Sequence, residues 1–163
     1  MRIPSRSVRV ALLSASTLLV GLVGCNDAAS GTSLVNQATQ TENSVATKDC
    51  TCNYAADGYA SAQACIADLD PLPTSTQASC MGKALDKYPR FKSYLECTIN
   101  AEKAYDRCLG GSCDPTVWNN CDAQAAAAED ACGEPCSGLT GTSLTDCQNE
   151  AVQLFAAIAA CGG

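Results

Sequence analysis

Residues 97–136 read CTINAEKAYDRCLGGSCDPTVWNNCDAQAAAAEDACGEPC, and this stretch holds six of the thirteen cysteines in the 163-residue chain. Cys97 and Cys108 are eleven residues apart, and so are Cys121 and Cys132. Eleven residues make about three turns of an α-helix, so each pair lies on one helix face. The frame Cys-x10-Cys-x4-Cys recurs as Cys-x10-Cys-x3-Cys after about 24 residues, which indicates a tandem duplication of one helical unit.

The turn between the two cysteine pairs predicts which cysteines meet. The segment Gly110–Asp114 ends one helix with two glycines and caps the next with an aspartate that precedes a proline. Both pairs are symmetric about this turn, and the alanines between them allow the close helix approach that a disulfide requires. An antiparallel hairpin would therefore form the disulfides Cys97–Cys132 and Cys108–Cys121.

Helical patterns also fill the sequence on both sides of this hairpin. No segment alternates with the period of two that a half-buried strand needs, and apolar residues recur instead at steps of three and four. The sequence therefore predicts an all-α fold, a small disulfide-braced helical bundle of about five helices. The expected helices follow Asp57, start at the capping box of Thr74, run from Arg90 to Leu109, start at Asp114, and follow Ser143.

Cysteines outside the hairpin indicate further crosslinks. Twelve cysteines follow Cys25, an even number that predicts up to six disulfides in an oxidising compartment. Cys65 and Cys80 are symmetric about Pro71–Pro73, which predicts a Cys65–Cys80 bridge. Six cysteines remain, and their fifteen possible pairings stay open: Cys50, Cys52, Cys113, Cys136, Cys147 and Cys161.

Composition suggests that these crosslinks stabilise a weak core. The apolar residues after Cys50 are mostly alanine and cysteine, which bury little area each. Disulfides, typically about 2–4 kcal/mol each, are then expected to be the main source of stability. The paired spacing resembles that of the Cys-x9-Cys helical hairpin proteins, with one more residue between the cysteines here.

The start of the chain has the order of a secretory signal peptide. Three arginines precede the apolar run Val10–Val23, which ends in Leu22-Val23-Gly24-Cys25. The run is too short for the roughly 20 residues of a membrane span. The four-residue stretch resembles the lipobox of bacterial lipoproteins, and this resemblance implies cleavage after residues 1–24 and a diacylglyceryl group on Cys25. Alternatives are a short membrane anchor and a non-lipidated signal peptide.

Two further regions follow the predicted signal peptide. Residues 25–49 are rich in Ser, Thr, Asn and Gln and lack aromatic residues, which predicts a lipidated, disordered tether that stretches to about 80 Å at most. Residues 50–163 form the expected cysteine-rich helical domain. We expect the protein to be lipid-anchored at a cell membrane, at the outer membrane or cell surface rather than the inner membrane.

Charge and residue types exclude several functions. Without residues 1–24 the chain keeps seven basic and seventeen acidic residues, a formal charge of −10, which disfavours nucleic acid as a partner. Histidine is absent, so the usual catalytic triad is excluded. The nearest paired carboxylates, Glu102 with Asp106 and Glu129 with Asp130, are expected on solvated helix faces. We therefore predict no catalytic residues and no cofactor.

Cysteine thiolates at Cys50–Cys52 or Cys132–Cys136 are the only metal-site candidates, and disulfide formation is the favoured alternative. The basic residues Lys83, Lys87, Arg90 and Lys92 cluster along the chain, whereas no base follows Arg107. A mixed-charge surface is the simpler interpretation. The sharper hypothesis is a bipolar domain whose basic side rests against anionic envelope polymers.

Three functions remain open. The leading prediction is a non-enzymatic, membrane-anchored envelope lipoprotein with a structural or binding role, whose partners are the membrane and an envelope polymer or protein. It is loosely similar to small Ala/Cys-rich envelope lipoproteins of myxobacteria. The second is a secreted-protease inhibitor with Gly133–Pro135 or Pro71–Pro73 as bait. The third is a small enzyme or metal carrier.

Overall fold

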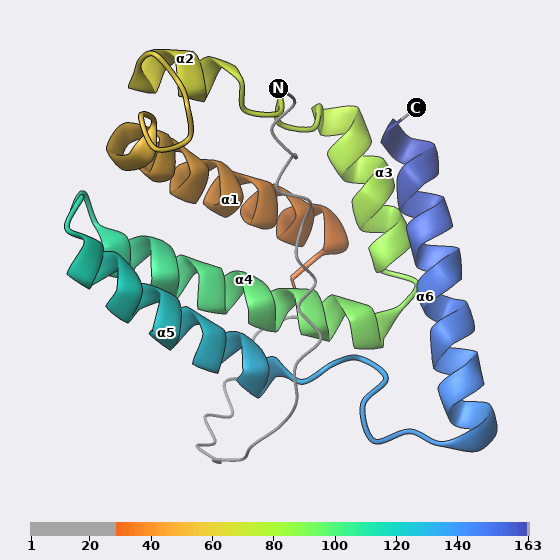
Figure 1. The fold of residues 1–163 in the computed structure, drawn as a ribbon. Coiled ribbons are helices and arrows are strands. Elements are labelled where there is room, and N and C mark those ends of the chain that lie inside the picture. Colours follow the sequence, from red (N-terminus) through yellow and green to blue (C-terminus); the bar gives the residue numbers. More distant parts are fainter. Residues whose placement is uncertain (1–28, 163) are drawn as a thin grey trace.

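The computed structural model describes residues 29–162, and this part of the chain is all helix and connecting turns (Figure 1). The prediction of a small, disulfide-braced all-α domain is confirmed. Five of its helices occupy the five expected segments, and one further helix precedes them. The helices are α1 (Gly31–Asn53), α2 (Ala62–Ala67), α3 (Ser75–Leu85), α4 (Pro89–Leu109), α5 (Pro115–Cys132) and α6 (Gly141–Gly162).

Local sequence signals set most of the helix ends. The Thr74 side chain accepts a hydrogen bond from the Gln77 amide while the Gln77 side chain bonds back to Thr74, which is the expected capping box. Asp114 caps α5 through the Thr116 amide. Gly110 and Gly133 end α4 and α5 with positive φ angles of 53° and 63°, which glycine adopts without steric strain.

Helix α1 corrects the predicted tether. The prediction of disorder over residues 25–49 is wrong for residues 31–49, which form most of α1. Two of the apolar residues in this segment, Leu34 and Val35, are buried. The threonines do not prevent helix formation because Thr39 and Thr41 donate hydrogen bonds to carbonyls of Val35 and Gln37 in their own helix. The folded domain therefore begins about twenty residues earlier than expected.

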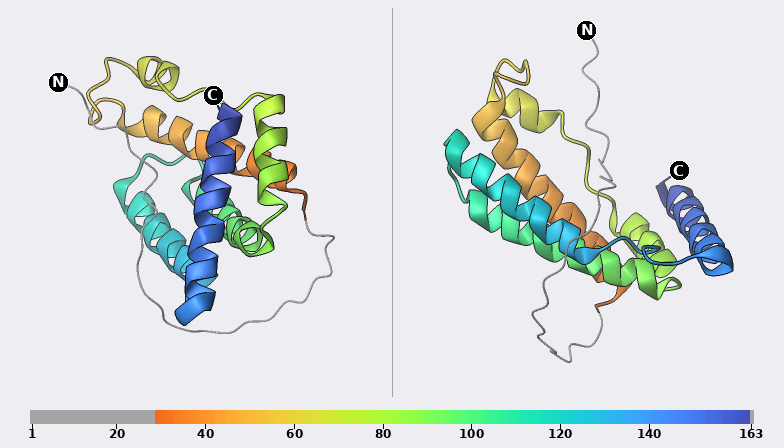
Figure 2. Two further views of the ribbon diagram at one scale, coloured as in Figure 1. Left: turned by 90° about the vertical axis from the view of Figure 1, so that its right-hand side faces the viewer. Right: turned by 60° about the horizontal axis from the view of Figure 1, so that its bottom comes forward.

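The helices form two groups that meet at a common core. Helices α1, α4 and α5 lie side by side, and α3 and α6 cross them at one end (Figure 2). The core where the groups meet consists of residues from both, with Ala29 packed against its edge. Its buried members are Leu34, Ala84, Leu85, Ile99 and Leu154.

Two glycines let α1 approach α3 closely. A Cβ atom on Gly82 would lie 2.1 Å from the amide nitrogen of Thr32, and one on Gly31 would lie 2.2 Å from the Gly82 carbonyl oxygen. The Gly31 amide also donates a 2.9 Å hydrogen bond to the Asp86 carboxylate. The start of α1 is therefore fixed against α3 by a backbone contact that no larger residue permits.

Six disulfides crosslink the described residues, and two of them are the hairpin bridges that the sequence predicts. Cys97 bonds to Cys132 and Cys108 to Cys121, with Cα–Cα distances of 5.6 and 5.7 Å. Helices α4 and α5 are thus held antiparallel by one bridge near the turn and a second that joins the middle of α4 to the last residue of α5. The other four bridges are Cys50–Cys65, Cys52–Cys113, Cys80–Cys161 and Cys136–Cys147.

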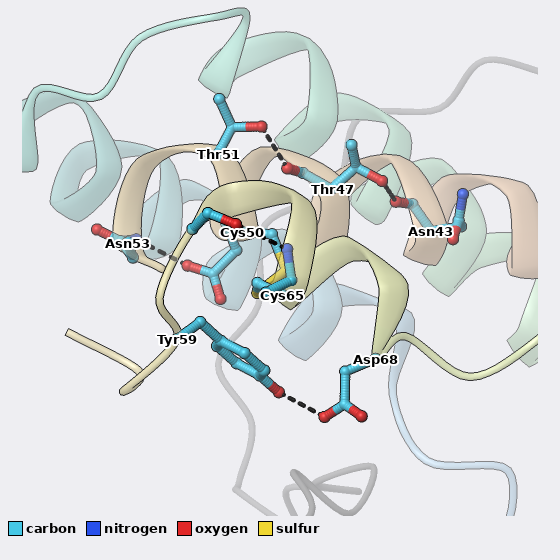
Figure 3. Close-up of a disulfide and its surroundings, with 11 residues drawn as sticks. Asn43, Thr47, Cys50, Thr51, Asn53, Tyr59, Cys65 and Asp68 are labelled. Carbon is cyan, nitrogen blue, oxygen red and sulfur yellow. Dashed lines mark hydrogen bonds between the residues drawn. A yellow bond between two sulfur atoms is a disulfide. The ribbon is translucent and has the colours of Figure 1, made fainter. Parts of the chain in front are cut away.

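The predicted Cys65–Cys80 bridge is wrong. Cys65 in α2 bonds instead to Cys50 at the end of α1, over a Cα–Cα distance of 5.4 Å (Figure 3). Cys80 in α3 bonds to Cys161, 81 residues later in α6. The prediction assumed a hairpin of α2 and α3 about Pro71–Pro73. Each helix packs against another neighbour instead, α2 against the end of α1 and α3 against both α1 and α6.

Candidate functional site

The four cysteines that were candidates for metal binding are each bonded to another cysteine elsewhere in the domain. Every one of the twelve cysteines between residues 29 and 162 belongs to a disulfide, so Cys50, Cys52, Cys132 and Cys136 carry no thiolate. Within the same residues, no group of three or more Cys, Asp or Glu side chains is arranged to hold a metal ion. The predicted lipidation residue, Cys25, lies outside the residues that the structure describes.

The two carboxylates of the predicted pair, Glu102 and Asp106, have different partners and different pKa shifts. Asp106 accepts hydrogen bonds of 2.7 Å from Ser44 Oγ and 2.9 Å from Lys48 Nζ, both on α1. Partial burial opposes ionisation of Asp106, but these bonds outweigh it and lower its pKa. The ionised Asp106 carboxylate therefore joins α4 to α1 through these bonds. A second polar contact, between Lys103 and Gln37, joins the same two helices.

Glu102 has a different environment, and the prediction that it lies on a solvated helix face is wrong. Its pKa is raised to about 7, chiefly by burial between the helices and in addition by the carboxylates of Glu42 on α1 and Glu129 on α5. Burial also raises the pKa values of Glu42 and Glu129. The sequence did not reveal this cluster because Glu42 fell in the predicted tether. Two acids from two other helices thus oppose the charging of Glu102 near neutral pH.

A hollow of about 370 Å³ lies beside the turn that joins α4 to α5. It is lined mainly by polar and aromatic residues from α1, α4 and α5 together with the turn before α5. Several of these polar groups already bond within the domain, as when Tyr105 donates to Asp122 over 2.6 Å and Trp118 Nε1 donates to the Ser112 carbonyl over 2.7 Å. These hydrogen bonds join the helix ends to one another, so the groups that make them are not free to bind a ligand.

The two predicted protease-bait segments differ in how they are held. Gly133–Pro135 lies between Cys132 and Cys136, which bond to α4 and α6 respectively. Pro71–Pro73 lies between α2 and α3, and the bridge that was expected to close it does not form. Leu72 in this second segment is 49% exposed.

Four basic residues lie close in sequence to Asp86, which contacts the start of α1. Asp86 accepts the Gly31 amide and also a 2.7 Å bond from Lys92 Nζ at the start of α4. These two bonds lower the pKa of Asp86, the bond from Lys92 being the stronger influence. We call these four exposed or half-exposed bases, all within six residues of Asp86 in the sequence, the basic end. It consists of Lys83, Lys87, Arg90 and Lys92.

Helix α6 borders this region and presents an apolar surface to solvent. It packs on α3 through Leu154 and is joined to it by the Cys80–Cys161 bridge. On its other side, Val152 and Phe155 are 68% and 65% exposed. We call this surface the α6 outer face; its members are Val152, Phe155, Ala156 and Ala159. Between residues 29 and 162, no helix is both long and apolar enough to cross a membrane.

Comparison with known proteins adds no relative. No family model, no curated protein and no solved structure matches this chain. The function must therefore be argued from the cysteine pattern, the charges and the surfaces described above.

Proposed function

We propose that this chain is a non-catalytic envelope lipoprotein, anchored by a diacylglyceryl group on Cys25, that presents a rigid helical module with a structural or binding role. Three features support the proposal: the signal-like sequence of residues 1–24, the lipobox-like stretch that ends at Cys25, and the crosslinked domain. The anchor would hold the module at the membrane of a cell envelope, where oxidation of thiols is normal.

The observation that carries this proposal is the use of the cysteines. The chain has thirteen, and the six disulfides of residues 29–162 consume twelve. The thirteenth is Cys25, at the position where the lipobox-like stretch requires a free thiol for acylation. A sequence that kept an odd cysteine without a use would risk mispairing during oxidation, because a free thiolate attacks disulfides.

The connectivity of the bridges supports a module built for rigidity. Each of the six helices contains at least one bonded cysteine, and the bridges link α1 to α2, α3 to α6 and α4 to α5. Cys52–Cys113 joins α1 to the α4–α5 turn, and Cys136–Cys147 joins the segment after α5 to α6. Such a network keeps a surface in one shape without needing a large apolar core.

The test is the chemistry of Cys25 in the full chain, expressed in a bacterium that processes lipoproteins. We expect mass spectrometry to find a new N-terminus at Cys25 carrying acyl chains, and thiol titration without reduction to find no free thiols. The matched variant Cys25→Ser should lose acylation and leave the membrane fraction while retaining all six disulfides. An unprocessed wild-type leader, or a processed chain with a free Cys25 thiol, would overturn the proposal.

A further inference from the structure

We infer that the folded domain lies directly on the lipid bilayer, with the basic end and the α6 outer face against it. This inference rests on the proposed anchor at Cys25. It identifies the module's first partner as an anionic lipid surface, contacted over α3 and α6, instead of a soluble molecule reached from a long tether.

The first argument is the length of chain between the anchor and the fold. Helix α1 begins at Gly31 and Ala29 already packs against the core, so four residue steps separate Cys25 from packed structure. Four steps reach about 14 Å when fully extended. The expected tether of 25–49 would have allowed about 80 Å. A bilayer-bound Cys25 therefore holds the domain within about one helix diameter of the headgroups.

The second argument is which part of the domain lies at that point. The Gly31 backbone contacts Gly82 of α3 and bonds to Asp86, so the chain enters the fold beside the C-terminal end of α3. Lys83, near the end of α3, and Lys87, in the turn that follows it, are both exposed. The short connection therefore brings the basic end close to the bilayer surface.

The third argument is the character of α6, which packs on α3 beside this entry point. Its second half, residues 151–162, contains no charged residue. Its acids, Asp146 and Glu150, are in the first half, and Asp146 is nine residues, or 2.5 turns, before Phe155. That spacing places Asp146 on the opposite side of the helix from Phe155. The α6 outer face can then enter the headgroup boundary without burying a charge.

Charge complementarity fixes the orientation. The basic end holds four of the seven bases that remain after residue 24, whereas seven acids and no base follow Arg107. An anionic bilayer attracts the bases and repels the acids. The attraction contributes about 1 kcal/mol for each basic residue near the surface. Helix α5, which carries Asp122, Glu129 and Asp130, would accordingly point away from the membrane.

The experiment uses the full-length acylated protein in vesicles of phosphatidylethanolamine with one quarter phosphatidylglycerol, some of the lipids brominated to quench tryptophan. The only native tryptophan is replaced by Trp118→Phe, and a probe is placed by Phe155→Trp on the α6 outer face or by Ala126→Trp on α5. Both positions are exposed, so both variants should fold. We expect the probe at 155 to be quenched at least threefold more than the probe at 126.

The second arm adds Lys83→Glu and Lys87→Glu to the Phe155→Trp protein, and we expect its quenching to fall by at least half at low salt. Equal quenching at 155 and 126, or quenching that the charge reversal leaves unchanged, would overturn the inference. Sedimentation with the vesicles and the acylated mass are measured on the same samples. A protein that lacks acylation contradicts the proposed function, whereas an acylated, sedimenting protein with equal quenching contradicts only this inference.

Discussion

The α4–α5 hairpin and the α3–α6 pair are both antiparallel helix pairs held by disulfides, yet they are built differently. In the hairpin, two bridges of sequence separation 13 and 35 join helices that follow one another in the chain. In the α3–α6 pair, a single bridge of separation 81 joins helices that have two others between them. The hairpin is a local unit, whereas the α3–α6 pair exists only once the whole domain has folded.

This difference predicts where the domain is weakest. Helix α6 lacks a second bridge to α3, and its buried contact with the core is largely Leu154, with Ala157 and Ile158 partly buried beside it. A hydrogen bond of 3.2 Å from Tyr88 to Gln153 adds a polar contact. We therefore expect α6 to open before the hairpin does, because few buried apolar contacts mean a low free energy of local unfolding.

Removal of the long-range bridge should have the largest effect. The double variant Cys80→Ala/Cys161→Ala should lower the free energy of unfolding by about 4 kcal/mol, since the bridge closes a long loop in the unfolded chain. Denaturant titration measures the loss, and hydrogen exchange should show that protection disappears from α6 first.

The matched variant is Cys108→Ala/Cys121→Ala, which opens the shorter loop of the hairpin. It should cost about 3 kcal/mol and leave the protection of α6 unchanged, because Cys97–Cys132 still joins α4 to α5. If both double variants lose protection in the same helices, the two regions do not differ as we describe.

The second prediction concerns the glycine contact that aligns α3 with α1. Gly82→Ala should destabilise the domain by about 2–3 kcal/mol, because the new Cβ overlaps the Thr32 backbone and overpacking outweighs the higher helix propensity of alanine. Gly111→Ala, in the hairpin turn, has no atom within 4 Å of the added carbon and should change stability by less than about 0.5 kcal/mol. Thermal unfolding of both variants provides the comparison, and a Gly82→Ala protein as stable as the wild type would refute the close contact.

The smallest expected effect is a pH dependence on the hairpin side of the molecule. The pKa of Glu102 is about 7 in the folded protein against an ordinary value of 4.5, so the folded state binds more protons between these values. Stability should therefore fall as pH rises from about 4.5 to 7 and remain lower above that. Glu102→Gln should remove this fall and stabilise the protein at pH 8 by about 1 kcal/mol after allowance for solvent screening.

The control for Glu102 is Glu134→Gln, which alters an exposed carboxylate in the segment after α5 and should leave the profile unchanged. The raised pKa values of Glu42 and Glu129 act in the same direction as that of Glu102, whereas the lowered pKa of Asp106 makes stability fall only at more acidic pH. A Glu102→Gln protein with the wild-type pH profile would show that the carboxylate is solvated in the folded state.

Sequence reasoning succeeded where the deciding contacts are local. The all-α class, the cap at Thr74, the hairpin turn and its two bridges all follow from residues within about forty positions of one another. It failed at α1, where a Ser/Thr-rich composition suggested disorder. The threonines bond within their own helix, and a few apolar residues and two bridges suffice to dock it. The predicted Cys65–Cys80 bridge is wrong for the same reason: Cys65 bonds to Cys50 in α1, a helix that the sequence did not predict.

The sequence by itself determined the helical periodicity, the helix ends, the hairpin disulfides and the separation of charge, because these depend on neighbours along the chain. Only the tertiary structure decided that α1 belongs to the fold, that Cys80 reaches Cys161, and that Glu42, Glu102 and Glu129 oppose one another. Those features depend on which helix surfaces pack together. An interior with so few large side chains leaves that choice to glycine contacts and disulfides, whose partners are distant in sequence.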